Sequence, residues 1–284
     1  MVAVAAIQMV SSNDRAPNLD RAAQLIAKAA NRGAKLIVLP ENFAVFGQVS
    51  TVKAAQEEGA ASGRIRTFLT EQAKSRGVWL VGGTIPTPTM TRKFFASCFV
   101  ISPQGVEVAC YNKIHLFDVQ VDDAQSRYHE SAIYQPGEKV VLVNTPIGVL
   151  GLAVCYDLRF PELFRLMVDH GAEIICLPAA FTQVTGAVHW QPLVRARAIE
   201  NQVFMIAADQ GGVHSEKRNT YGHSMIVDPW GDILAVHEKG EGVVIADIEL
   251  DSLVQIRAQI PVLENRRIMF GSASIPVEVI QTQN

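Results

Sequence analysis

Two segments of the sequence repeat the same order of features, and this repeat limits the possible folds more than any other pattern. The segments are RGAKLIVLPENF, residues 32–43, and HGAEIICLPAAF, residues 170–181. In each copy a glycine suited to ending a helix precedes a fully apolar strand, and a proline and a phenylalanine follow the strand. An amphipathic helical pattern precedes each copy, so we expect a duplicated helix–strand unit.

Apolar strands and amphipathic helices alternate along the rest of the chain. Strands are predicted at residues 2–9, 34–40, 78–86, 148–157, 172–181, 203–210 and 242–250. Helices are predicted at residues 18–33, 62–76, 160–171, 188–202 and 251–259. Hairpins are predicted at residues 95–113 and 224–237, around the turns SPQG and DPWG. No Pro/Gly/Ser-rich linker divides the chain, so we predict one α/β domain, residues 1–284, with helices on the outer faces of mixed sheets.

The composition favours an enzyme with a small-molecule substrate. Hydrophobic residues make up 49% of the 284 residues, which is enough for a substantial core. The net charge of -3 comes from mixed charges without a long run of one sign, so we expect neither a nucleic-acid nor a membrane partner. No apolar segment reaches the roughly 20 residues that span a bilayer, and the N-terminal MVAVAAIQMV does not resemble a signal peptide. We therefore expect a cytoplasmic protein.

The cysteines do not form a metal-binding or disulfide pattern. None of the four has CxxC spacing, and most lie within apolar runs: Cys98, Cys110, Cys155 and Cys176. The glycine-rich nucleotide-binding motifs GxGxxG and GxxxxGK[ST] are also absent from the sequence. We expect reduced thiols, no metal and no cofactor.

Cys155 differs from the other cysteines in its place along the chain. It ends an apolar strand, just before a helix expected to begin near Arg159, where the positive helix end would stabilise a thiolate. The alternative is a structural role, because free cysteine is among the most buried residue types, and we assign that role to the other three. A nucleophilic role requires a base and oxyanion donors nearby, and no histidine of the chain lies in a cysteine-peptidase motif.

Glu41 and Lys113 can supply those functions. Glu41 directly follows the strand of the first repeat, whereas the second repeat has Ala179 and Ala180 in place of Glu41 and Asn42. The fold alone therefore does not require a glutamate there, and a partly desolvated carboxylate can act as a general base. Lys113, in YNKIHLFD, also ends a strand, and its ammonium could stabilise an oxyanion beside the reacting carbon.

The segments LPENF, NKIHLFD and GLAVCYDLRFPEL resemble, in this order, the three signature segments of the nitrilase superfamily of carbon–nitrogen hydrolases. The resemblance implies a four-layer α-β-β-α sandwich that dimerises through its helices. It also implies that Glu41, Lys113 and Cys155 form a catalytic triad. Glu130, in YHESAIYQPG, matches a further glutamate that holds the lysine and assists the substrate in that family.

Within the superfamily, RARAIENQ, FTQVTGAVHW and AADQGGVHSEKRNTYGHSMIVDPWG are most similar to the deaminated glutathione amidases. The resemblance implies a metabolite-repair amidase that forms a thioester on Cys155 and releases ammonia from a carboxylate-bearing substrate. The alternatives are an ω-amidase for α-keto acid amides, a nitrile hydrolase, and a non-catalytic binding module of the same fold. The intact triad disfavours the last, and residues 119–125 match the family less well and leave the pocket rim undefined.

Two further groups of residues are candidates for substrate contacts. The backbone N–H of Tyr156, next to the nucleophile, could share the oxyanion with Lys113. His214, Lys217 and Arg218 fall close together in a predicted loop. Charged loop residues need no ligand, but one or more of these could bind a substrate carboxylate, Arg218 through a bidentate pair.

Overall fold

The computed structural model describes residues 1–58, 63–268 and 275–282, whose strands form two large sheets. The first sheet has seven strands, in the order β15 (Gly242–Ile248), β1 (Val2–Gln8), β2 (Leu36–Val38), β3 (Trp79–Val81), β5 (Phe94–Ile101) and β4 (Ile85–Pro88), with β6 (Glu107–Asn112) also paired to β5. The second has the order β14 (Ile233–His237), β13 (Ser224–Val227), β12 (Phe204–Asp209), β11 (Ile174–Ala179), β10 (Gly148–Leu152), β9 (Val140–Thr145) and β16 (Val277–Gln281). A separate hairpin consists of β7 (Asp118–Gln120) and β8 (Arg127–His129).

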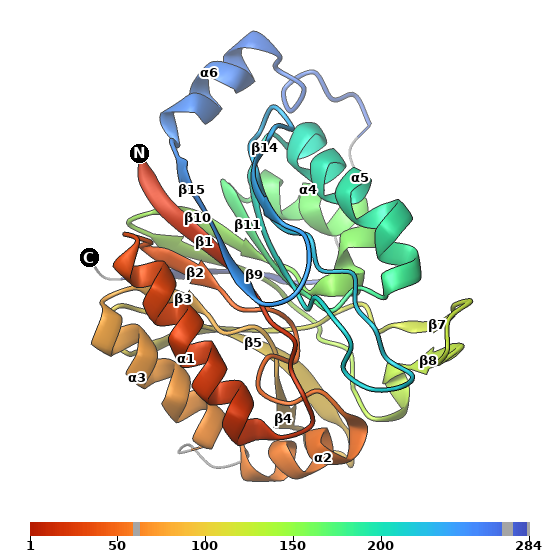
Figure 1. Cartoon of the computed structure of the whole chain (residues 1–284). Helices are drawn as coiled ribbons and strands as arrows, with labels where there is room; N and C mark the ends of the chain where they lie inside the picture. Colours follow the sequence, from red (N-terminus) through yellow and green to blue (C-terminus); the bar gives the residue numbers. More distant parts are fainter. Residues whose placement is uncertain (59–62, 269–274, 283–284) are drawn as a thin grey trace.

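Helices cover the outer face of each sheet, as Figure 1 shows. On the first sheet these are α1 (Arg15–Asn31) and α3 (Arg64–Arg76), and on the second they are α4 (Pro161–Asp169) and α5 (Gln183–Asn201). The shorter helices α2 (Gln48–Glu57) and α6 (Asp251–Gln259) lie at the periphery. The layers therefore follow the order α-β-β-α, which confirms the sandwich that the resemblance implied.

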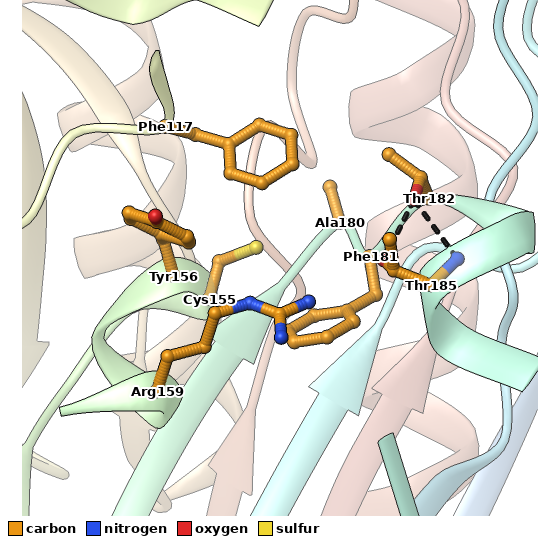
Figure 2. Close-up of a pocket in the computed structure, with 8 residues that line it drawn as sticks. All are labelled: Phe117, Cys155, Tyr156, Arg159, Ala180, Phe181, Thr182 and Thr185. Atoms are coloured by element: carbon orange, nitrogen blue, oxygen red, sulfur yellow. Dashed lines mark hydrogen bonds between the residues drawn. The ribbon is translucent and has the colours of Figure 1, made fainter. Parts of the chain in front are cut away.

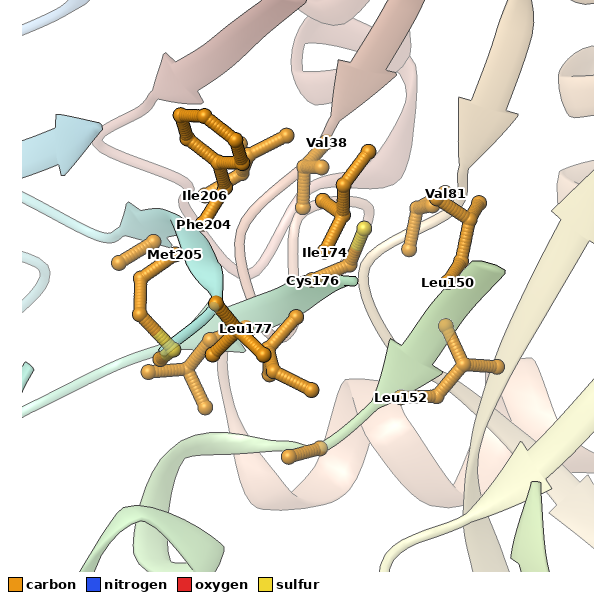
Figure 3. Close-up of a cluster of buried hydrophobic side chains, with 14 of the residues drawn as sticks. Val38, Val81, Leu150, Leu152, Ile174, Cys176, Leu177, Phe204, Met205 and Ile206 are labelled. Carbon is orange, nitrogen blue, oxygen red and sulfur yellow. The ribbon is translucent and has the colours of Figure 1, made fainter. Parts of the chain in front are cut away.

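Side-chain alternation along the central strands builds two cores. In β1, Val4 and Ala6 join the core between the sheets, whereas Ala5 and Ile7 pack with residues of α1. Strand side chains point alternately to the two faces, so one apolar strand serves both cores. Figure 3 shows side chains of the first sheet, including Val38, facing those of the second, including Cys176. Cys98 and Cys176 are both fully buried there, as the structural interpretation of these thiols predicted, whereas Cys110 on β6 is exposed and does not fit that prediction.

The repeated units occupy equivalent places in the two sheets. β2 runs parallel to β1 and β3, and β11 runs parallel to β10 and β12. The ends of the two units meet, because the N–H of Glu41 donates to the carbonyl of Ala179 at 3.3 Å. Gln210 joins both units: its backbone N–H donates to the carbonyl of Ala179, and its side chain donates to that of Glu41. The repeat therefore brings Glu41 to the centre of the molecule.

Most predicted elements are present, with shifts that local interactions explain. Both predicted hairpins are antiparallel pairs. Helix α1 begins earlier than predicted because Asp14 caps its first turn by accepting from the N–H of Ala16, and Thr182 caps α5 in the same way. Residues 78–86 are two strands, β3 and β4, rather than one. The sequence analysis did not predict α2, β7, β8, β9 or β16.

Gly83, between β3 and β4, supports the turn that carries Glu41. It has a φ of +58°, and a Cβ there would lie 2.2 Å from the carbonyl oxygen of Pro40. Gly33 also has a positive φ, of +95°, but nothing lies within 4 Å of its Cβ position. We predict that Gly83→Ala lowers the free energy of unfolding by about 3 kcal/mol or more, because it adds a collision to the backbone strain.

Gly33→Ala is the matched control and should cost only about 1–2 kcal/mol, the strain of a left-handed residue. Denaturant unfolding of both variants measures the difference. Equal losses would show that the turn below Glu41 accommodates a methyl group.

Candidate active site

Cys155 lies just beyond the end of β10, a strand of the second sheet. It follows β10 and begins a 3₁₀ turn, Cys155–Arg159, and it is 7% exposed. Its φ of +48° lies in the left-handed region, which a non-glycine residue adopts at a cost. Such strained residues concentrate at functional sites, where the surrounding structure holds them in place.

Glu41, Lys113 and Glu130 form a buried cluster of charges. The Lys113 Nζ donates to the Glu41 Oε1 at 2.8 Å and to both carboxylate oxygens of Glu130 at 2.9 and 3.0 Å. The Lys113 side chain is 1% exposed and that of Glu41 is 4% exposed, whereas that of Glu130 is 23% exposed. The cluster thus joins a residue after β2, one after β6 and one after β8.

The charges of this cluster control one another. Burial alone would lower the pKa of Lys113, but the carboxylates of Glu130 and Glu41 raise it well above its ordinary value. Burial raises the pKa of Glu130, and the ammonium of Lys113 opposes that rise. Lys113 therefore stays charged without water, and Glu130 holds a proton more readily than an ordinary glutamate does.

The environment of Cys155 favours the neutral thiol. Burial and then the negative charge of Glu41 raise its pKa well above the ordinary value, while Lys113 and a hydrogen bond from the backbone of Ala180 oppose the rise. The helix expected near Arg159 begins at Pro161, and a 3₁₀ turn lies between it and Cys155. Attack by the neutral thiol on a substrate therefore requires a base that removes the proton during the step, whereas slow alkylation follows the small thiolate fraction present at equilibrium.

A cleft of about 680 Å³ opens above these residues. Its lining includes Glu41, Glu130, Cys155 and three residues of the loop between β12 and β13: His214, Lys217 and Arg218. The β7–β8 hairpin supplies another wall, so the rim that the sequence left undefined is a small two-stranded sheet. The structure thus places the predicted loop residues on one cleft with Glu41 and Cys155, while Lys113 lies buried behind Glu41 and Glu130.

The three loop residues differ in what they can offer a ligand. Both ring nitrogens of His214 are engaged, by the Ser11 carbonyl at 2.7 Å and the Thr220 hydroxyl at 2.7 Å, and burial lowers its pKa to about 4. His214 is therefore a neutral residue that holds the loop. Lys217 is exposed at the cleft wall.

Arg218 is half-buried and partly engaged within the protein. It donates to the Tyr128 hydroxyl at 2.9 Å and to the Ala180 carbonyl at 2.7 Å, and its guanidinium lies over the Tyr128 ring. These contacts fix the guanidinium at the cleft and leave its other N–H groups for a ligand. A fixed guanidinium loses less freedom when it binds a carboxylate.

Sequence reasoning missed Arg159, which lines a narrow pocket on the other side of Cys155. Figure 2 shows its guanidinium beside the ring of Phe181, and the distance to the ring centre is 5.2 Å. Tyr156, Thr185 and Phe117 also line this pocket. The only signal in the sequence was its position four residues after Cys155. Cys155 borders both this pocket and the larger cleft.

No cluster of three or more histidine, cysteine, aspartate or glutamate side chains suited to a metal ion occurs in residues 1–58, 63–268 and 275–282. Within the same residues, no helix is both long and apolar enough to cross a bilayer. The candidate site itself presents a thiol, an ammonium and two carboxylates.

The fold and this site define a class of α-β-β-α sandwich protein with a buried thiol near a lysine–carboxylate cluster. Residues 3–258 match the family described as carbon-nitrogen hydrolase. The chain therefore belongs to the carbon–nitrogen hydrolase family and is an enzyme of that family. The resemblance seen in the sequence is confirmed.

Curated relatives narrow the comparison to amidases. A protein of Synechocystis sp. named deaminated glutathione amidase is 44% identical over 266 residues, which are 92% of this chain and 97% of the relative. A Danio rerio protein named omega-amidase is 36% identical over 265 residues, which are 93% of this chain and 94% of the relative. The sequence indicated the first of these activities and left the second as an alternative.

Solved structures share the fold. Nit3 of Saccharomyces cerevisiae, described as a member of branch 10 of the nitrilase superfamily, is 33% identical with a TM-score of 0.85, covering 94% of this chain and 97% of that one. An amidase of Nesterenkonia sp. AN1 is 27% identical with a TM-score of 0.77, covering 92% and 98%. That protein, a glutamate-to-glutamine variant, carries acrylamide added at its active-site cysteine.

The electrostatics of Cys155 lead to a prediction about its reactivity. Because the negative charge of Glu41 raises the pKa of Cys155, Glu41→Gln should lower that pKa and increase the thiolate fraction at a fixed pH. We predict that iodoacetamide alkylates Cys155 about tenfold faster in Glu41→Gln than in the wild type at pH 8, the effect of one pKa unit. Peptide mass spectrometry separates Cys155 from the exposed Cys110.

Glu71→Gln, on the outer surface of α3, is the control and should react like the wild type. Equal or slower alkylation in Glu41→Gln would contradict the repulsion between Glu41 and the thiolate.

Proposed function

We propose that the protein hydrolyses amides through a thioester on Cys155. Glu41 takes the thiol proton while the sulfur attacks the amide carbon, which forms the C–S bond and a tetrahedral oxyanion. Lys113 and the backbone N–H of Tyr156 stabilise that oxyanion. Glu41 then gives its proton to the leaving nitrogen, the C–N bond breaks, and the amine departs.

The second half of the reaction uses the same groups. Glu41 removes a proton from water, the resulting hydroxide attacks the thioester carbon, and the acid product leaves as the sulfur regains a proton. Glu130 keeps the Lys113 ammonium in place and, at the cleft wall, can contact the substrate. No step requires a metal or an organic cofactor.

The observation that carries this proposal is the buried contact between Glu41 and Lys113 beside a thiol whose pKa is raised. A resting thiolate would need no base, whereas a neutral thiol needs one at the moment of attack. The charge of Glu41 acts on Cys155, so the carboxylate is close enough to influence the sulfur. This arrangement favours an enzyme over the non-catalytic binding module.

Deaminated glutathione is the substrate that we propose. Support comes from the relative of that name at 44% identity, and from cationic side chains on both sides of Cys155. Arg159 and Arg218 could each bind a carboxylate, and two such contacts would hold the amide against the sulfur. Lys217 adds a positive charge at the rim.

The leaving group depends on the substrate. The amide bonds of a peptide such as glutathione release an amine, whereas a primary amide releases ammonia. The ω-amidase alternative, which is supported by the relative from Danio rerio, predicts ammonia from an α-keto acid amide. A nitrile hydrolase would pass through a thioimidate at the same cysteine. Product analysis on an amide, a peptide-like amide and a nitrile distinguishes the three.

We further propose a cytoplasmic homodimer in which residues 1–284 act as one domain. The core between the sheets is continuous, which supports a single domain. Exposed apolar side chains on α5 and α6 support association through helices: Val184, Val188, Ile199 and Val254. Sedimentation of the purified chain tests the dimer.

The nucleophile assignment predicts that Cys155→Ala abolishes turnover and leaves the fold intact, because the substitution removes one sulfur at a strand end. Glu41→Gln and Lys113→Ala should each lower kcat by about a hundredfold or more. Cys98→Ala, a buried thiol away from the cleft, is the control and should keep near-normal kcat. A Cys155→Ala variant that retained a tenth of the wild-type rate would disprove the assignment.

The substrate assignment predicts that Arg218→Ala and Arg159→Ala raise the KM for deaminated glutathione by about tenfold or more, with a much smaller effect on a small uncharged amide. The reason is that only the charged substrate loses a carboxylate contact. The measurement is kcat/KM for both substrates. Arg76→Ala, exposed on α3, is the control, and equal losses on the two substrates would reject carboxylate recognition.

A further inference from the structure

Asp157 is fully buried, and each of its two carboxylate oxygens accepts two hydrogen bonds. Its Oδ2 accepts from the Tyr111 hydroxyl at 2.7 Å and from the Val154 N–H at 2.8 Å. Its Oδ1 accepts from the backbone N–H of His115 at 3.0 Å and from the His115 Nδ1 at 2.7 Å. Because Asp157 is the acceptor, the Nδ1 of His115 carries the proton. Four hydrogen bonds therefore converge on one side chain.

These donors flank the proposed catalytic groups. Tyr111 and His115 lie two residues before and two residues after Lys113. Val154 directly precedes Cys155, and Asp157 follows it by two residues. The carboxylate thus joins the segment that carries the ammonium to the turn that carries the sulfur.

The same contacts support the strained backbone at Cys155. The Asp157 side chain accepts from the N–H of Val154, and the Asp157 N–H donates to the Val154 carbonyl at 3.0 Å. The two bonds close a loop around Cys155, whose φ is +48°. A left-handed residue persists only where surrounding contacts determine its conformation.

His115 is also held from its other side. Its ring stacks on Phe160, with the ring centres 3.7 Å apart and the planes 7° from parallel. Phe160 follows the 3₁₀ turn, so this stacking fixes the same two segments against each other. His115, Tyr111 and Asp157 line neither of the spaces that border Cys155, so they act only through other residues.

We propose that Asp157 and His115 are positioning residues that fix the Lys113 ammonium relative to the Cys155 sulfur. This inference rests on the proposed function, since Lys113 and Cys155, the two groups held in position, are catalytic only in that proposal. A buried polar cluster of this kind need not add stability over apolar packing, so its value lies in the geometry that it specifies. Misplacing a catalytic group by about 1 Å can cost about a hundredfold in rate.

The test uses His115, whose side chain is 26% exposed and can be shortened without opening a buried core. His115→Ala removes the side-chain bond to the Asp157 Oδ1 and keeps the bond from the backbone N–H. His115→Asn restores the side-chain bond, because the amide nitrogen of asparagine lies the same number of bonds from Cα as Nδ1 does. We expect His115→Ala to lower kcat about 10- to 100-fold with KM within about threefold, and His115→Asn to recover kcat to within about threefold of the wild type.

A second readout does not depend on turnover. Lys113 lowers the pKa of Cys155, so loosening its position should raise that pKa and slow alkylation of Cys155 by iodoacetamide at least about threefold in His115→Ala. Asp157→Asn should behave like His115→Ala, because the NH₂ group of asparagine cannot accept the hydrogen bonds that one of the carboxylate oxygens accepts. Tyr111→Phe, which keeps the ring, provides a further variant if Asp157→Asn does not fold.

Asp228→Asn is the control, an aspartate in the turn between β13 and β14 that lines neither space bordering Cys155. Asparagine can keep its contacts, acceptance from the N–H groups of Trp230 at 3.0 Å and Asp232 at 2.8 Å, so kcat should stay near the wild-type value. A folded His115→Ala with kcat within twofold, or with only KM changed, would overturn the positioning role. Loss of activity in Cys155→Ala with full activity in His115→Ala would reject this inference and leave the proposed function standing.

Discussion

The ammonium of Lys113, held out of water between two carboxylates, is the interaction on which the organisation of the site depends. A buried lysine without a partner would lose its charge, and a buried glutamate without a partner would gain a proton. Here Glu41 and Glu130 contact Lys113 at 2.8 and 2.9 Å, from segments far apart in the sequence. Removing Lys113 would leave two buried carboxylates without a cation, so the cluster ties the first sheet and the β7–β8 hairpin to one geometry.

The repeated helix–strand unit explains how this cluster reaches the nucleophile. Two similar strands, β2 and β11, end against each other, and only the first copy carries an acidic side chain directly after its proline. The second copy has Ala179 and Ala180, whose backbone groups contact Glu41, Cys155 and Arg218. The first copy thus carries the proposed base, and the second copy supplies backbone groups that contact it and its neighbours.

The sequence predicted the fold class, the main strands and helices and the candidate triad because apolar periodicity and short motifs report local structure. It could not predict β9 and β16, which pair although they are far apart in the chain. Nor could it predict the raised pKa of Cys155, which arises from burial and a charge brought close by folding. Arg159 was missed for the same reason: its role depends on a pocket, and a pocket has no sequence period.

The most direct test of the account is the intact mass of the protein, quenched with acid during turnover of deaminated glutathione and followed by peptide mapping. If the reaction passes through a thioester, the mass of the acyl part of the substrate is added, and it maps to the peptide that contains Cys155. The adduct should be absent from Cys155→Ala. An enzyme that turns over without any added mass, or with the acyl group on another residue, would contradict the account.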